Sequence, residues 1–154
     1  MGFFDGYNVA TSGMSAQRTR INIVSANIAN AQTTHGKDGK PYQKQNVVFK
    51  EMLIDAQNNT QKDGLGNSQS SSLPNDRLMG VKVQQIVDAN AKPILRYEPT
   101  HPDANKDGYV AYPNINPVIE MTDLIEAMRS YEANLSAFQT QKTMDTKTID
   151  ILKG

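Results

Sequence analysis

The sequence has no cysteine and no tryptophan, and aromatic residues fill only 6% of its 154 positions. Without cysteine, disulfide scaffolds and thiolate metal sites are excluded. Apolar residues amount to 38% of the chain, which is a small fraction for a compact core at this length. We therefore expect a small, elongated assembly of elements rather than a globule around one large core.

The chain also lacks a net charge, because sixteen basic residues balance sixteen acidic ones. A neutral chain gives no reason to expect a nucleic acid or an anionic membrane as the main partner, and neutrality favours self-association. No stretch approaches the roughly 18 apolar residues of a membrane span, so we expect a protein that is not membrane-spanning. The first residues, MGFFDGYNVATSG, have neither a basic segment nor a long apolar run, which argues against a cleaved signal peptide.

Recognised catalytic signatures are missing too: there is no nucleophile elbow, phosphate-binding loop, dinucleotide fingerprint or zinc-protease motif. His35 and His101 stand in turn-forming sequence without a metal-ligating partner at a suitable spacing. Residues 103–108, DANKDG, match the first half of an EF-hand calcium loop, but Asn114 stands where its bidentate Glu belongs. We interpret this segment as a turn, and we expect no enzyme activity, no small-molecule substrate, no metal and no cofactor.

What the sequence does contain is two long stretches with apolar residues at alternating steps of three and four. This is the spacing of a helix that packs lengthwise against a partner. The first stretch runs from Phe3 to Ala31 and the second from Pro117 to Leu152, where Asn116 and Pro117 form a helix start signal. The predicted subunit-packing seam consists of Tyr7, Met14, Ile21, Val24, Ile28, Met121, Leu124, Met128, Tyr131, Leu135, Phe138, Ile149 and Leu152.

Polar residues accompany the first stretch at Asn22, Asn27 and Asn30, all of which are poor helix formers. Two interpretations are open. The amides either form a solvated polar face or hydrogen-bond to neighbouring helices in a packed assembly, where buried polar groups can fix the register.

The region between the two stretches is irregular. The sequence pattern predicts a β-hairpin formed by residues 80–87 and 94–97, and a short extended segment at residues 42–49. Residues 55–76 have the composition of a polar loop. We therefore predict a mainly α fold with a small β part. Its terminal helices, in residues 1–34 and 116–154, pair as an elongated coiled-coil-like domain, and residues 35–115 form an irregular middle region that contains the hairpin.

Three segments resemble bacterial flagellar rod and hook proteins. SGMSAQRTRINIVSANIANAQTT, at residues 12–34, resembles their N-terminal signature, and EAMRSYEANLSAFQTQKTM, at residues 126–144, is similar to their C-terminal signature. HPDANKDGYVAYPNINPVIEM, at residues 101–121, is similar to the stretch characteristic of proximal rod proteins.

This resemblance implies a structural subunit of the flagellar basal body that polymerises helically through its terminal helices. Such a subunit is part of the drive shaft and of the export channel wall, and it reaches the periplasmic rod by type III export without a cleaved signal peptide. The implied partners are other flagellar rod proteins, copies of itself, and the membrane ring and export gate beneath the rod. The alternatives are another rod or hook-type axial protein, or a coiled-coil export adaptor, which would form a discrete dimer.

Overall fold

The computed structural model describes residues 5–36, 38–53, 79–89 and 91–153. The elements, in chain order, are α1 (Asp5–Ala29), β1 (Gln45–Leu53), β2 (Met79–Asp88), β3 (Ile94–Tyr97), β4 (Tyr109–Tyr112) and α2 (Pro117–Lys153). The prediction of a mainly α fold with a small β part is confirmed. The predicted polar loop at residues 55–76 lies outside the described residues.

Helix α2 has 37 residues and is therefore about 55 Å long. It begins where the sequence predicts, since the side-chain oxygen of Asn116 accepts a hydrogen bond from the backbone N–H of Val118 at 3.0 Å. This bond satisfies one of the free N–H groups at the helix start, and Pro117 occupies the first position, where no N–H is needed. Both helices are too polar to span a membrane, as far as the described residues go.

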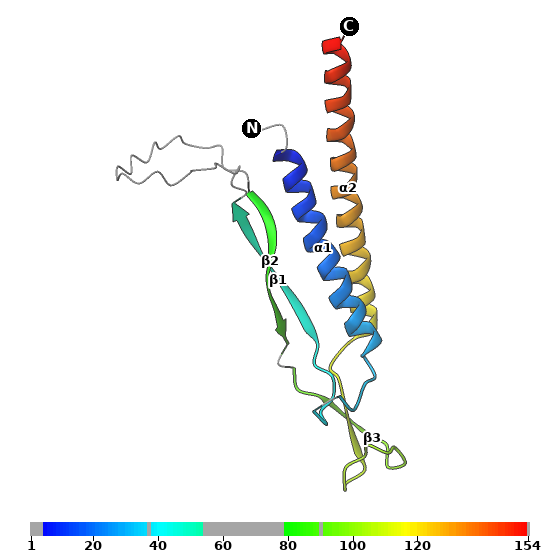
Figure 1. Cartoon of the computed structure of the whole chain (residues 1–154). Helices are drawn as coiled ribbons and strands as arrows, with labels where there is room; N and C mark the ends of the chain where they lie inside the picture. Colours follow the sequence, from blue (N-terminus) through cyan, green and yellow to red (C-terminus); the bar gives the residue numbers. More distant parts are fainter. Residues whose placement is uncertain (1–4, 37, 54–78, 90, 154) are drawn as a thin grey trace, which may run out of the picture.

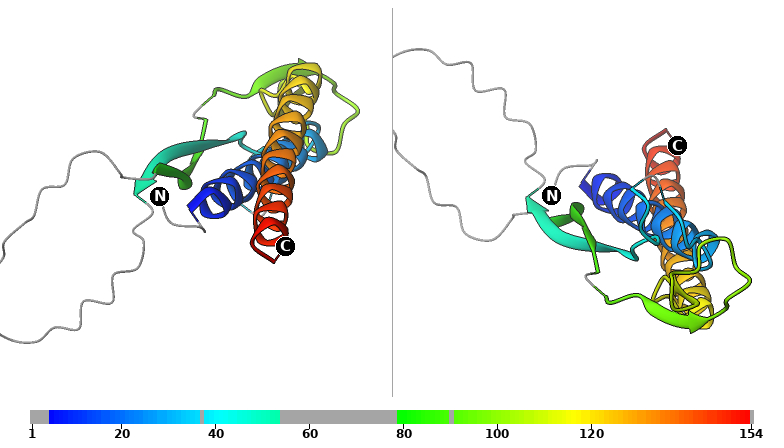
Figure 2. Two further views of the ribbon diagram at one scale, coloured as in Figure 1. Left: turned by 90° about the horizontal axis from the view of Figure 1, so that it is seen from above. Right: turned by 90° about the horizontal axis from the view of Figure 1, so that it is seen from below.

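The molecule has three layers, with α1 in the middle, α2 on one side and the β1–β2 ribbon on the other (Figures 1 and 2). The two helices run antiparallel, and α2 continues beyond the N-terminal end of α1 (Figure 1). Side chains define the register near both ends of the pair: the rings of Tyr7 and Phe138 pack edge to face at 4.9 Å, and Asn27 reaches Glu120 at 3.1 Å.

The ribbon pairs β1 with β2 from Gln45 opposite Asp88 to Leu53 opposite Met79, with an irregularity between Val48 and Phe49. Alternation along β1 places Val47 and Phe49 on the same face of the ribbon, where they line a cavity with Val24 of α1. The ribbon thus uses its apolar face to cover one side of the first helix.

The prediction that residues 80–87 and 94–97 form a β-hairpin is wrong. Strand β2 pairs with β1, and β3 pairs with β4 in register from Ile94 opposite Tyr112 to Tyr97 opposite Tyr109. The chain does not turn back after β2, because the backbone N–H of Ala89 donates to the carbonyl of Lys44 and prolongs the pairing with β1. The segment predicted as short and extended is a nine-residue strand, long enough to pair with nearly all of the ten-residue β2.

Buried residues are few and mostly small. The apolar ones among the described residues are Ala10, Ala16, Val24, Val110, Ile115 and Ala127. Two polar residues, Asn27 and Glu120, are buried as deeply as any of these. A core of this size leaves much apolar surface exposed, and the distribution of that surface is the main clue to function.

Candidate assembly surface

Small residues on α1 allow α2 to approach closely. A Cβ atom added to Gly13 would lie 3.0 Å from the side-chain nitrogen of Asn134, and one added to Gly6 would lie 3.4 Å from the side-chain oxygen of Gln141. These facing positions are seven residues apart on each helix. At these two positions, α1 turns a glycine rather than a large apolar side chain directly toward α2.

The predicted seam on α2 is divided by this geometry. Leu124, Tyr131 and Phe138 are half-buried on the face that packs against α1. Met121, Met128 and Leu135 are 51%, 42% and 36% exposed, because each stands one residue past a position that faces α1. The residues at those facing positions are Glu120, Ala127 and Asn134.

The predicted seam on α1 is divided in the same way. Val24 is buried, whereas Tyr7, which follows the facing residue Gly6, is half-buried and contacts Phe138 across the helix pair. Met14, Ile21 and Ile28 are half-buried, and each again follows a facing residue. Those facing residues are Gly13, Arg20, whose guanidinium lies 3.6 Å from the Asp123 carboxylate, and Asn27.

In an antiparallel pair, the residues that follow the facing positions of both helices come to the same side of the pair. Met14, Ile21 and Ile28 of α1 therefore lie on the same side of the pair as Met121, Met128 and Leu135 of α2. We name these six residues the apolar row. The row lies on the side away from the ribbon, because the residue before Gly13, Ser12, accepts a hydrogen bond from the backbone N–H of Val81 in β2 at 3.1 Å.

The last two predicted seam residues, Ile149 and Leu152, lie where α2 has passed the end of α1. Asp145 still interacts with α1, because its carboxylate raises the pKa of Tyr7, chiefly through a side-chain hydrogen bond. We name residues 146–153 the C-terminal overhang. It belongs to the end of α2 that extends past α1 (Figure 1). Its residues Ile149, Ile151 and Leu152 are 45%, 80% and 81% exposed.

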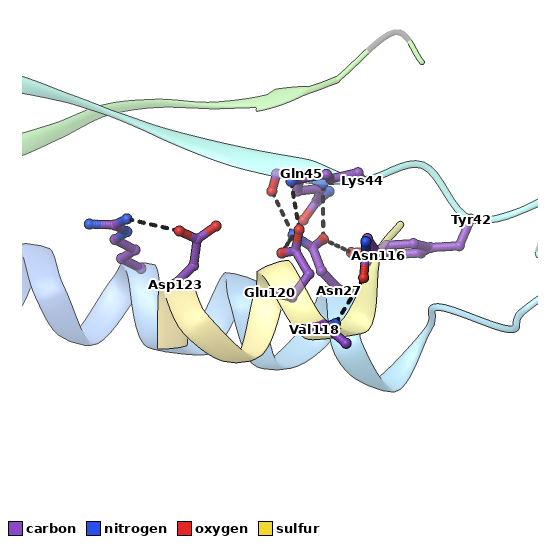
Figure 3. Close-up of polar contacts among 9 residues, drawn as sticks. Asn27, Tyr42, Lys44, Gln45, Asn116, Val118, Glu120 and Asp123 are labelled. Atoms are coloured by element: carbon purple, nitrogen blue, oxygen red, sulfur yellow. Dashed lines mark hydrogen bonds and ion pairs between the residues drawn. The ribbon is translucent and has the colours of Figure 1, made fainter. Parts of the chain in front are cut away.

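A buried polar cluster joins the two helices to the start of β1 (Figure 3). The side-chain nitrogen of Asn27 donates to the Glu120 carboxylate at 3.1 Å and to the carbonyl of Gln45 at 2.9 Å. Its side-chain oxygen accepts hydrogen bonds from the Tyr42 hydroxyl at 3.1 Å and from the backbone N–H of Gln45 at 3.0 Å. The Lys44 ammonium lies 2.6 Å from the other Glu120 oxygen, so the buried charge is paired.

This cluster decides between the two interpretations of the asparagines. Asn27 hydrogen-bonds to another helix, but that helix belongs to the same chain. Asn22 is exposed, and Asn30 donates to the backbone carbonyl of Ala26 in its own helix. A satisfied polar network of this kind specifies one arrangement of its elements, because any shift would leave buried polar atoms without partners. No pattern in the sequence distinguished Glu120 from the neighbouring exposed carboxylates.

The segment that resembles half a calcium loop is a turn, as predicted. The side-chain oxygen of Asn105 accepts hydrogen bonds from the backbone N–H groups of Asp107 and Tyr109 at 3.0 and 2.8 Å, and Gly108 supplies the left-handed backbone with φ at 81°. His101 accepts a hydrogen bond from the backbone of Asp103 at 3.1 Å. Within the described ranges, no three His, Cys, Asp or Glu residues come together as metal ligands.

Comparison with known proteins matches both terminal regions. A family model described as flagella basal body rod protein matches residues 8–36, and one described as flagellar basal body rod FlgEFG protein C-terminal matches residues 106–151. The flagellar basal-body rod protein FlgC of Borreliella burgdorferi is 39% identical over 158 aligned residues, which cover all of both chains. FlgC of Bacillus subtilis is 38% identical over 97% of this chain and 98% of its own, and FlgC of Salmonella typhimurium is 34% identical over 98% of each.

Proposed function

The chain belongs to the FlgC family of flagellar basal-body rod proteins, and on that basis we propose that it is a structural subunit of the proximal rod. The family is structural and not enzymatic. The structural observation that supports the proposal is the apolar row, in which α2 exposes Met121, Met128 and Leu135 at intervals of seven residues. Contiguous apolar surface of this kind marks a site of protein association.

We propose that residues 1–34 and 116–154 act as one coiled-coil-like domain and that the predicted seam residues outside the helix pair make contacts between subunits. A contact between different faces of successive copies generates a helical tube instead of a closed dimer. Such a tube serves as a drive shaft and as the wall of an export channel. The part of the middle region that packs against this domain is the β1–β2 ribbon, which contacts α1.

The family also indicates where the subunit acts. We propose that it is exported without a cleaved signal peptide by the flagellar export apparatus and assembles in the periplasm. Its partners are copies of itself, other rod proteins, and the membrane ring and export gate beneath the rod.

A substitution in the apolar row tests this function. Leu135→Asp introduces a charge at an exposed position, so the monomer is expected to keep its fold and its export while incorporation into the rod is lost. Ile21→Asp is expected to block incorporation in the same way. The measurements are motility, the amount of exported chain, and the chain content of isolated basal bodies. Ala133→Asp is the matched control, because Ala133 is exposed on the other side of α2.

Rods that form normally with Leu135→Asp would show that the apolar row is not an assembly surface. The alternative of a coiled-coil export adaptor makes a different prediction, because it requires a stable dimer of fixed size. Sedimentation of the purified chain over a range of concentrations separates a dimer that stops growing from a series of larger species.

A further inference from the structure

We propose that the apolar row of one copy receives the C-terminal overhang of a second copy. This inference rests on the proposed function, because it specifies which two surfaces meet when the subunits polymerise. The row is the side of one molecule's helix pair, and the overhang is the end of another molecule's α2.

The row offers a site for a third helix. Its residues recur every seven positions on both helices, over about 21 Å of helix. Side chains in such rows form ridges on a helix surface, and the side chains of another helix can pack between them. The ribbon covers the opposite side of α1 and leaves this side open.

The C-terminal overhang is a helical segment with exposed apolar residues that could pack on the apolar row. Ile149 and Leu152 continue the line of α2 that includes Phe138 and Asp145, which pack against α1 in the same molecule. Beyond Asp145, this line continues with Ile149 and Leu152, which are apolar and are 45% and 81% exposed. The overhang is therefore an extension of an established helix-packing face, about 12 Å long.

The overhang cannot reach the row of its own molecule. It lies on the same straight helix as Leu135, separated from it by more than three turns, and it points away from the row (Figure 1). The occupant must therefore come from another copy. The contact is heterologous, so each added copy presents a new free row or a new free overhang, and growth continues. A contact between two rows would close a symmetric pair and stop growth.

The absence of native cysteine allows a direct test with the full-length chain. One variant carries Met128→Cys in the row, and a second, isotopically labelled variant carries Leu152→Cys in the overhang. The two are mixed and oxidised, and the disulfide-linked products are identified by mass. A disulfide requires Cα atoms within about 7 Å, so a mixed disulfide reports direct contact between the surfaces.

The expected result is a mixed Met128→Cys with Leu152→Cys product at roughly ten times the yield obtained when Ala133→Cys replaces the row variant. A tenfold difference corresponds to about 1.4 kcal/mol of preference. A predominance of Met128→Cys homodimers would overturn the inference in favour of row-to-row packing. Equal yields with the Ala133→Cys control would overturn it as well.

Sedimentation of the same mixture separates the inference from the proposed function. If large species form while the mixed disulfide stays at the control level, the proposed polymerisation is supported, but the proposed contact between row and overhang is wrong. If no association occurs at any concentration, both the proposed self-polymerisation and the proposed contact are wrong. Leu152→Asp gives an independent check, because it should weaken association roughly tenfold and leave the helical signal of the monomer unchanged.

Discussion

Glu120 is the single residue on which the arrangement of this molecule depends most. It is 1% exposed, and its charge is compensated by Lys44 and by the Asn27 amide. A buried ion pair is a weak source of net stability, but removing one partner is costly because the other is left without compensation. The cluster therefore fixes the relative position of α1, α2 and β1 more than it adds to the stability of the fold.

Glu120→Ala is expected to lower the free energy of unfolding by about 3–5 kcal/mol, as for other broken buried pairs. Urea unfolding followed by circular dichroism measures this change. Glu126→Ala is the control: its carboxylate lies 3.8 Å from Arg20 but is 66% exposed, so its loss should cost less than about 1 kcal/mol. Similar losses in the two variants would show that the cluster does not hold the helices together.

Tyr42 makes the stability of the cluster dependent on pH. Burial raises the pKa of Tyr42 above its ordinary value of 10.0, and the nearby Asp88 and Glu120 carboxylates add to the effect. Because the folded-state pKa is the higher one, the stabilisation is complete below pH 10 and is lost as pH rises through the folded-state pKa. The free energy of unfolding is therefore expected to fall in this alkaline range, and to fall less in Tyr42→Phe. Parallel declines in both proteins would contradict the assignment.

The contact between the two helices depends on small residues. A Cβ atom at Gly13 would lie only 3.0 Å from the Asn134 side chain, whereas one at Gly6 would lie 3.4 Å from Gln141, which is an ordinary contact distance. Alanine favours a helix over glycine by about 0.5–1 kcal/mol. Gly6→Ala is therefore expected to stabilise the protein by an amount of this order, while at Gly13 the tight contact offsets the gain.

The test is a double-mutant cycle with Asn134→Ala, evaluated from urea unfolding. The truncation removes the crowded amide, so Gly13→Ala should regain its stabilising effect in the Asn134→Ala background. If Gly13→Ala stabilises both backgrounds equally, the helices are not in close contact at this point.

Both helices and the start of α2 could be predicted from the sequence, because long periodic stretches and a cap at Asn116 are strong local signals. The residues that face each other across the pair could not. Periodicity identifies the largest apolar residues, such as Met128 and Leu135, but it does not distinguish packing within a chain from packing between chains. The tight contact instead involves Gly13 and Asn134, and the fully buried residue of α2 is Ala127; none of these three gives a strong apolar signal.

The strand pairing was mispredicted for a related reason. Residues 80–87 and 94–97 are neighbours in the sequence, and proximity favours a hairpin. The observed partner of β2, however, is β1, which precedes it by more than twenty residues and matches it in length. Asn27 was identified as one of three candidate polar contacts, but its partner Glu120 could not be recognised, because burial of a carboxylate is a tertiary effect.

The described part of the molecule is long and thinly packed, and it exposes large apolar residues on α2, on the ribbon and on strands β3 and β4. Its stability should therefore depend on its concentration. Association stabilises the folded state by mass action, so the apparent melting temperature is expected to rise with protein concentration. Calorimetry at several concentrations measures this rise, and Leu135→Asp should abolish it. A melting temperature that is independent of concentration in the unmodified protein would indicate a self-sufficient monomer.

The pairing of Leu53 with Met79 has a consequence for how such chains can vary. The chain leaves the ribbon and returns to it at two directly opposed positions, so the ends of any intervening segment are already together. Each doubling of the length of a flexible segment then costs only about 0.6 kcal/mol. Insertions and deletions during evolution should accumulate at this point, where neither the helix pair nor the buried cluster is disturbed. The same position is the natural choice for inserting a reporter domain.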